Sequence, residues 1–98
     1  MTIKEAQELV DAWIAKNVSH PRTDLTNMAS LTEEVGELAR VIALKYSDHS
    51  ISEHTIRAEM SNEIGDVLWA LISLANQAGI DLTESLIENL DKRSFQQS

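Results

Sequence analysis

The residues most able to do chemistry in this chain form two short acidic patterns, EEVGE at residues 33–37 and EIGD at residues 63–66. Each pattern places two carboxylates three residues apart, which on an α-helix puts them side by side on one face. Like charges in this position destabilise a helix by roughly a few tenths of a kcal/mol, and two such pairs on neighbouring helices would repel further. A hard divalent cation with oxygen ligands is the simplest compensation. The patterns therefore predict a magnesium site and a phosphate-cleaving enzyme.

The composition indicates a small helical domain that associates with copies of itself. The chain has 98 residues, which suits a single domain over residues 1–98, and a domain of this size buries only a modest share of its surface. Yet 43% of the residues are hydrophobic, which is more than a lone helical hairpin could hide. We therefore expect a homodimer or a homotetramer.

Charge and residue usage argue against several classes of function. The net charge of −8 argues against binding to nucleic acid, whose backbone needs clustered Lys and Arg. The absence of Cys removes disulfides and zinc–sulfur sites. The sequence shows neither a signal-peptide pattern nor an apolar run long enough for a bilayer, which predicts a cytoplasmic protein without a membrane partner.

Helical periodicity runs through the chain, and no strand pattern interrupts it. The pattern predicts four helices, over residues 2–17, 26 or 27–46, 52–78 and 81–94. Thr2 and Glu5 form a capping-box pattern at the first start, and Gly79 supplies the stop of the third helix. The apolar half of that third helix should be buried on several sides. The predicted fold class is all-α.

The second and third helices are expected to pack antiparallel through the short polar turn at residues 47–52. Glu34 and Glu37 then lie near the middle of one helix, at the border of its apolar stripe. They face Glu63 and Asp66, which hold the same position on the other helix. A solvated acidic face is the alternative, but the nearness of both pairs to apolar residues favours four carboxylates around one small volume.

The two acidic patterns, with twenty-five residues between them, resemble the EExxE…ExxD signature of the MazG-like all-α nucleotide pyrophosphohydrolases. The similarity continues in NMASLT at 27–32, LAR at 38–40, DVLW at 66–69 and ANQAGIDL at 75–82. It covers the chain from the first helix to about Arg93. The compactness resembles the small, single-domain, dCTP-pyrophosphatase-like branch. The resemblance implies a four-helix-bundle-type fold that is completed by oligomerisation.

The resemblance also implies the chemistry. Family members cleave nucleoside triphosphates between the α and β phosphates and need Mg²⁺, here expected as one or two ions per site with Mn²⁺ as a substitute. By motif position, the metal ligands would be Glu34, Glu37, Glu63 and Asp66. The catalytic candidates are Glu34 and Glu33, of which Glu33 would orient or deprotonate the attacking water or else be a surface residue. Bound ions would neutralise the triphosphate and activate that water.

Five further residues are candidates for holding the substrate. Trp13 would stack on the base, because similar proteins place an aromatic residue there, although a tryptophan on an apolar stripe is more often core or interface. Lys45, Lys92 and Arg93 would contact the pyrophosphate end, or would simply be cations favoured near helix C-termini. Asn76 would hydrogen-bond the base or ribose, or would satisfy a buried contact between helices.

Three hypotheses for function follow. The leading one is a Mg²⁺-dependent nucleotide pyrophosphohydrolase with a house-cleaning role, which converts non-canonical or surplus dNTPs to monophosphate and pyrophosphate. The second is phosphoribosyl-ATP pyrophosphohydrolase, a related all-α enzyme. The third is a non-catalytic acidic helical interaction protein, which would bind metal weakly and turn over no nucleotide.

Overall fold

The chain folds into four α-helices and, over the residues that the structure describes, contains no β-strand. This computed structural model describes residues 1–97, and the side chains of residues 1–94. The helices are α1 (Ile3–Asn17), α2 (Asp24–Ser47), α3 (Glu53–Ala78) and α4 (Leu82–Gln97). None of the described helices combines the length and the hydropathy that a membrane span requires. The all-α prediction is confirmed.

Local sequence signals set most of the helix ends. The Thr2 hydroxyl accepts a hydrogen bond from the Glu5 amide, and the Glu5 carboxylate accepts one from the Thr2 amide, so the predicted capping box is present. The Ser52 hydroxyl caps α3 at its start, and Gly79 ends it with a left-handed φ of 71°. The Asp81 carboxylate accepts from two amides in the first turn of α4.

Two helix boundaries differ from the sequence prediction. α2 begins at Asp24, before the predicted start, because the Thr23 hydroxyl accepts from the Thr26 amide and so caps the helix earlier. α4 continues past Ser94, where the sequence predicts fraying, and ends at Gln97. Both differences lengthen a helix without moving the acidic residues to another face.

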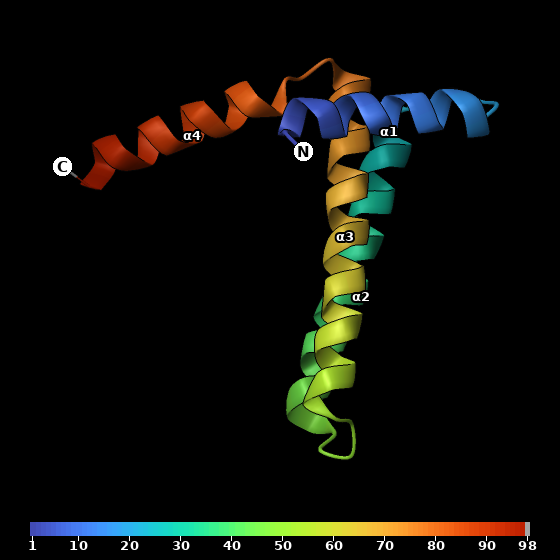
Figure 1. The fold of residues 1–98 in the computed structure, drawn as a ribbon, viewed down its shortest axis with the longest axis vertical. Coiled ribbons are helices and arrows are strands. Elements are labelled where there is room, and N and C mark those ends of the chain that lie inside the picture. Colours follow the sequence, from blue (N-terminus) through green and yellow to red (C-terminus); the bar gives the residue numbers. More distant parts are fainter. Residues whose placement is uncertain (98) are drawn as a thin grey trace.

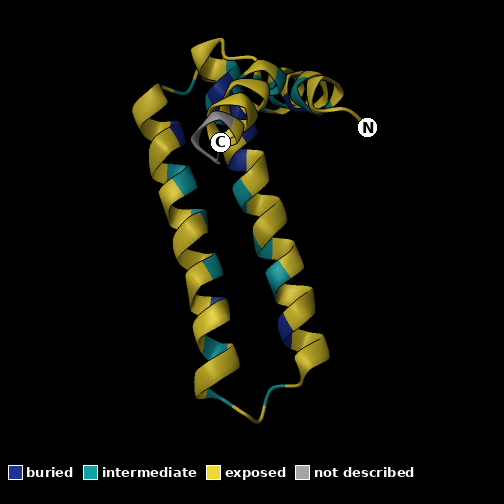
Figure 2. Ribbon diagram, turned by 90° about the vertical axis from the view of Figure 1, so that its left-hand side faces the viewer, coloured by how far each residue is buried: buried dark blue, intermediate teal, exposed yellow. Residues whose placement is uncertain are grey.

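The two longest helices, α2 and α3, lie side by side and antiparallel, as the short turn between them predicts (Figures 1 and 2). Buried residues lie on their facing sides and at the crossing with α1, and Val41, at 1% exposure, is the most deeply buried. The buried hydrophobic residues are Val10, Val41, Ile56, Ala70, Ile72 and Ala75. This thin core sets the register of α2 against α3.

α1 crosses the C-terminal end of α3, where a polar network ties the two helices together (Figure 1). The Gln7 side-chain amide donates to Asn76 Oδ1 at 2.8 Å and to the Ile80 carbonyl at 2.9 Å. Gln7 Oε1 accepts from the Leu82 amide at 3.0 Å, and the Asn76 amide donates to the Gln7 carbonyl. One side chain of α1 therefore holds both the end of α3 and the start of α4.

The C-terminal half of α3 is less buried in the single chain than its apolar sequence predicts. Ala70 and Ile72 are buried, but Leu68, Trp69 and Leu71 remain between 39% and 53% exposed. The reason lies in the arrangement of the helices. α2 and α1 pack against α3, whereas α4 contacts α1 and extends away from the α2–α3 pair (Figure 1).

Gln7→Leu tests the network at the α1–α3 crossing. The substitution leaves the Leu82 amide and Asn76 Oδ1 without their partners, so we expect the free energy of unfolding to fall by about 1–3 kcal/mol. Urea unfolding followed by circular dichroism measures this change. The same exchange at exposed Gln77 of α3 is the control and should cost less than about 0.5 kcal/mol. Equal losses for the two variants would contradict the role given to Gln7.

Candidate active site

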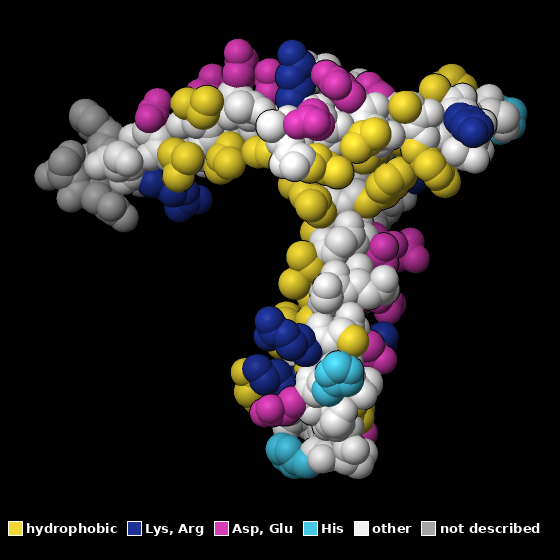
Figure 3. Space-filling view, viewed as in Figure 1, with side chains coloured by type: hydrophobic (Ala, Val, Ile, Leu, Met, Phe, Trp, Pro, Cys, Tyr) yellow, Lys and Arg dark blue, Asp and Glu magenta, His cyan; other side chains and the backbone are white. Residues whose placement is uncertain are grey.

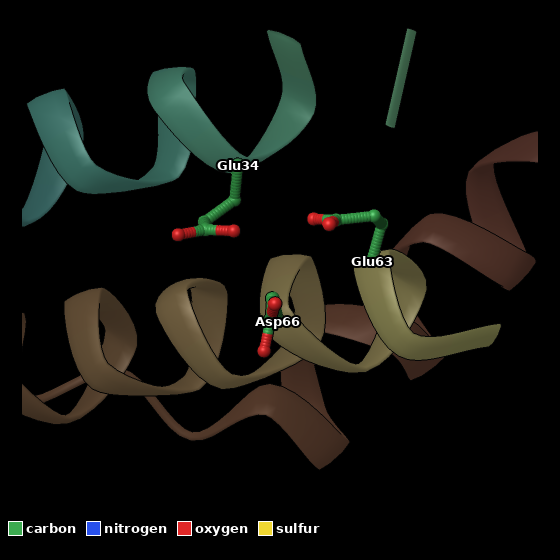
Figure 4. A group of neighbouring side chains, drawn as sticks. All are labelled: Glu34, Glu63 and Asp66. Atoms are coloured by element: carbon green, nitrogen blue, oxygen red, sulfur yellow. The ribbon is translucent and has the colours of Figure 1, made fainter. Parts of the chain in front are cut away.

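The register between α2 and α3 brings three carboxylates together. Glu34 extends from α2 toward α3, where Glu63 and Asp66 lie on neighbouring turns (Figure 4). One oxygen from each side chain lies within 4.8 Å of the other two. Glu34 and Glu63 are partly buried, whereas Asp66 is exposed. We call Glu34, Glu63 and Asp66 the acidic cluster; it contains three of the four predicted metal ligands.

The other two predicted acids of α2 lie outside the acidic cluster. The carboxylate of Glu37 accepts a hydrogen bond from Arg40 Nε at 3.2 Å, in an ion pair whose side chains are both exposed. Glu33 is exposed and does not join the group of three. The structure therefore places Glu33 and Glu37 beside the acidic cluster on α2 but does not bring their carboxylates into it.

The acidic cluster holds like charges, and among the described residues no Lys or Arg forms an ion pair with it. Partial desolvation, and then the negative charges of Asp66 and Glu63, raise the pKa of Glu34 above its ordinary value of 4.5. Glu63 Oε2 is buried and has no hydrogen-bond partner among the described residues. A buried carboxylate oxygen without a partner is costly, and converging oxygens are the ligands that hard divalent cations prefer. The donor set therefore fits Mg²⁺ or Mn²⁺.

A cavity of about 230 Å³ opens beside the acidic cluster, between α2 and α3. Its lining residues are Arg22, Asn27, Ser30, Glu34, Asp66, Trp69, Ala70 and Ser73. Apart from the two acids, none of these was predicted as a site residue. A signal was present in the helical spacing. Asn27 and Ser30 precede Glu34 at intervals that keep all three on one face of α2. Ser73 stands in the same relation to Asp66 on α3.

Two predicted substrate residues lie at the α1–α3 crossing. Trp13 packs edge-to-face on Trp69, with ring centroids 5.2 Å apart and an interplanar angle of 87°, so it meets the cavity wall through Trp69. Trp13 is also 51% exposed, so it is not a core residue of the single chain. Asn76 donates a hydrogen bond to Gln7 and accepts one from it. This is a contact between helices, the alternative role that the sequence analysis gave to Asn76.

Three predicted cations lie away from the acidic cluster. Lys45 lines a groove of about 820 Å³ near the α2–α3 turn, and its ammonium lies 5.6 Å from the centroid of the Tyr46 ring. Lys92 and Arg93 are exposed on the C-terminal half of α4, which points away from the α2–α3 pair (Figure 1). The single chain does not bring these cations to the carboxylates. Because the groove contains no member of the acidic cluster, we take the smaller cavity as the candidate site.

Helices that present converging carboxylates beside a polar cavity are suited to metal-assisted hydrolysis. Comparison with known proteins identifies the family, because residues 22–97 match the MazG nucleotide pyrophosphohydrolase domain. The chain therefore belongs to the MazG nucleotide pyrophosphohydrolase family, and it is a hydrolase that acts on phosphoric anhydrides. The resemblance inferred from the two acidic motifs is confirmed.

Similar proteins are found in Bacillus. The protein YpjD of Bacillus subtilis strain 168 is 39% identical over 84 residues, which cover 86% of this chain and 76% of YpjD. The solved structure of YpjD gives a TM-score of 0.77 at 37% identity, over 94% of this chain and 92% of that chain. The crystal structure of the Bacillus-conserved MazG protein, described as a nucleotide pyrophosphohydrolase, gives 0.79 at 35% identity, over 94% and 88%. The arrangement of the four helices is thus shared with both of these solved structures.

Glu34→Gln tests the repulsion within the acidic cluster. Because the pKa of Glu34 is raised in the folded chain, folding favours its protonated form. That contribution to stability is present below the ordinary pKa of 4.5 and is lost as the pH rises through the raised value. In EDTA at neutral pH, Glu34→Gln should therefore melt at a higher temperature than the parent.

With magnesium present, the parent should melt at a higher temperature than Glu34→Gln. We expect MgCl₂ to raise the Tm of the parent by binding the folded state, and to raise that of Glu34→Gln much less. Scanning calorimetry in EDTA and in MgCl₂, between about pH 4 and pH 8, measures both effects. Glu8→Gln, at an exposed position of α1, is the matched control and should respond to MgCl₂ like the parent. A variant less stable than the parent in EDTA would contradict the repulsion.

Proposed function

We propose that this enzyme hydrolyses nucleoside triphosphates between the α and β phosphates and releases a monophosphate and pyrophosphate. The observation that supports this most directly is the acidic cluster, in which the buried Glu63 Oε2 lacks a partner. Bound Mg²⁺ or Mn²⁺, as one or two ions, would neutralise the triphosphate and lower the pKa of the attacking water. Membership of a family of nucleotide pyrophosphohydrolases favours this function over a non-catalytic interaction protein.

The acids of the two motifs would divide the work. Glu34, Glu63 and Asp66 would bind the cation directly, because their oxygens already converge. Glu37 would join them by leaving Arg40, at low cost, because an exposed ion pair contributes only about 0–1 kcal/mol. Glu33 would orient or deprotonate the attacking water. Its charge helps to raise the pKa of Glu34, which puts it within electrostatic reach of the cluster.

The proposed substrates are non-canonical or surplus deoxynucleoside triphosphates, which the enzyme would remove in the cytoplasm as a house-cleaning activity. The support is the size and place of the cavity, which holds about 230 Å³ and is continuous with Glu34 and Asp66. This space suits one nucleoside beside the reacting phosphate. Phosphoribosyl-ATP, which carries a second ribose phosphate, is the bulkier alternative. Residues 1–98 would act as one domain, although Ser98 lies outside the described residues.

Glu63→Gln tests the proposed reaction. Glutamine keeps the shape of the side chain and removes the charge that a metal ligand needs, so we expect kcat/KM to fall by at least about 100-fold. The assay follows monophosphate and pyrophosphate from ribo- and deoxyribonucleoside triphosphates and from phosphoribosyl-ATP, with MgCl₂ present. Glu59→Gln, an exposed position one helical turn earlier, is the matched control and should retain activity.

The products separate the possible outcomes. Diphosphate and inorganic phosphate would contradict cleavage between the α and β phosphates. Turnover of phosphoribosyl-ATP alone would establish the alternative enzyme. A folded parent that hydrolyses none of these compounds would overturn the proposed function.

We also propose that the working form is a homodimer or homotetramer. The radius of gyration is 16.3 Å, against about 13 Å for a compact domain of this length. The accessible surface is 7547 Å², against about 5,600 Å² for a compact monomer of 10.9 kDa. The excess of roughly 2,000 Å² is of the size that a stable protein interface buries. Hydrophobic side chains gather on the inner side of the angle between α4 and the α2–α3 pair (Figure 3).

Assembly would give the three remote cations a role. On α4, Leu86, Ile87 and Leu90 are between 48% and 54% exposed, so this helix has an apolar face to bury against a second copy. If α4 packs against a second copy, its Lys92 and Arg93 would contact the pyrophosphate end of a substrate bound by that copy. Lys45, near the α2–α3 turn, is a third proposed phosphate contact.

A mixture of two defective variants tests whether sites are shared between copies. Glu63→Gln and the double variant Lys92→Ala/Arg93→Ala should each be nearly inactive alone. Unfolded and refolded together in equal amounts, they should recover roughly a quarter of the parental activity, because half of the dimers would be mixed and one of their two sites intact. Analytical ultracentrifugation establishes the assembly. Formation of mixed dimers without recovered activity would exclude Lys92 and Arg93 from a neighbour's site.

A further inference from the structure

Asn27 is the most deeply buried polar side chain of the cavity wall and, like Ser73, makes no side-chain hydrogen bond among the described residues. It is 3% exposed, and its carboxamide makes no hydrogen bond within the part of the chain that the structure describes. Its polar atoms keep access to the cavity, because Glu63 Oε2 is the only fully buried side-chain oxygen or nitrogen without a partner in the same residues. The carboxamide of Asn76, by contrast, is satisfied by Gln7. Asn27 therefore offers its donors and its acceptor to whatever enters the cavity.

The position of Asn27 along α2 fixes its distance from the reacting end of the site. Asn27 precedes Glu34 by seven residues, which at 1.5 Å per residue is about 10 Å along the helix axis. Because α3 runs antiparallel, Ser73, seven residues after Asp66, lies at the same end of the cavity as Asn27. The cavity thus has the carboxylates of Glu34 and Asp66 at one end and the neutral side chains of Asn27 and Ser73 at the other. Trp69 lies in its wall, and Arg22 lines it while donating a hydrogen bond to the Ser30 hydroxyl. That spacing suits a nucleoside whose phosphate is held at the acidic cluster.

We propose that Asn27 reads the edge of the nucleobase, at the end of the cavity away from the acidic cluster. The inference rests on the proposed function. A carboxamide presents a donor beside an acceptor and so pairs with a base edge that carries the complementary groups. A buried polar group of this kind discriminates strongly, because a base that fails to match it leaves it unpaired. Ser73 supplies a second polar contact, and Trp69 supplies apolar surface.

The experiment compares the base preference of the parent with that of Asn27→Leu, which keeps the number and branching of the side-chain heavy atoms and removes the hydrogen bonds. kcat/KM is measured for each canonical ribo- and deoxyribonucleoside triphosphate with MgCl₂. We expect Asn27→Leu to lose about tenfold or more on the best base and little on the others, through KM, so that the ranking flattens. The same exchange at exposed Asn17, at the end of α1, should leave the ranking intact.

Stability separates base reading from a structural role. Replacing an unpaired buried carboxamide by leucine should leave the Tm of the metal-free protein unchanged or higher, and the rise caused by MgCl₂ should be as in the parent. A lower Tm with an unchanged ranking of bases would overturn the proposal, because Asn27 would then support the fold. An equal loss on every base would overturn it too.

A binding measurement in EDTA keeps this inference distinct from the proposed reaction. Nucleoside monophosphates of the four bases are titrated against the parent and Asn27→Leu, and the shift in Tm is recorded. Selective binding by the parent that Asn27→Leu loses would support base reading, even if no triphosphate were hydrolysed. Hydrolysis by the parent with no base preference, and no selective binding of monophosphates, would overturn the inference while leaving the proposed function in place.

Discussion

The antiparallel register of α2 against α3 is the constraint on which the rest of this structure depends. A small set of buried side chains, of which Val41 is the most deeply buried, holds the two helices together. A slip of one residue turns a side chain by about 100° around its helix, which would carry Glu34 away from Glu63 and Asp66. The same slip would break the alignment of Asn27 with the far end of the cavity. The thin core must therefore hold the register that brings the carboxylates together, and not merely bury apolar surface.

That register holds together charges that oppose folding. The pKa of Glu34 is raised by partial desolvation and by its acidic neighbours, so at neutral pH the ionised cluster lowers the stability of the metal-free chain. Glu63 contributes a buried oxygen without a partner among the described residues. Helices chosen only for stability would place lysine or leucine at such positions. A local conflict of this kind, in a chain whose caps and turns agree with its fold, is typical of a functional site.

What could be predicted from the sequence was whatever depends on local chemistry or on one short turn. Capping residues and Gly79 act within a few residues, and a short connection forces α2 and α3 to be antiparallel, so the meeting of Glu34 with the acids of α3 followed. The place of the Glu37 carboxylate outside the acidic cluster could not be predicted in this way, because it depends on an exposed ion pair with Arg40. Asn27 and Ser73 were missed because a polar residue on an inner face gains meaning only when its partner across the helix pair is known.

The sequence of the C-terminal half of α3 predicts burial, whereas the single chain leaves this half partly exposed. A second copy packed against it would remove the disagreement. Residues as apolar as Leu68 and Leu71 are expected inside, yet they are about half exposed, and α4 extends outward with its own apolar residues uncovered. The large radius of gyration and the excess accessible surface have the same cause, because α4 extends away from the other helices. A helix that projects from its own domain gains little stability there, because most helical stability comes from packing an apolar face. In the proposed homodimer or homotetramer, α4 would pack against another copy, and its two cations, Lys92 and Arg93, would then lie near the carboxylates of that copy instead of those of their own chain.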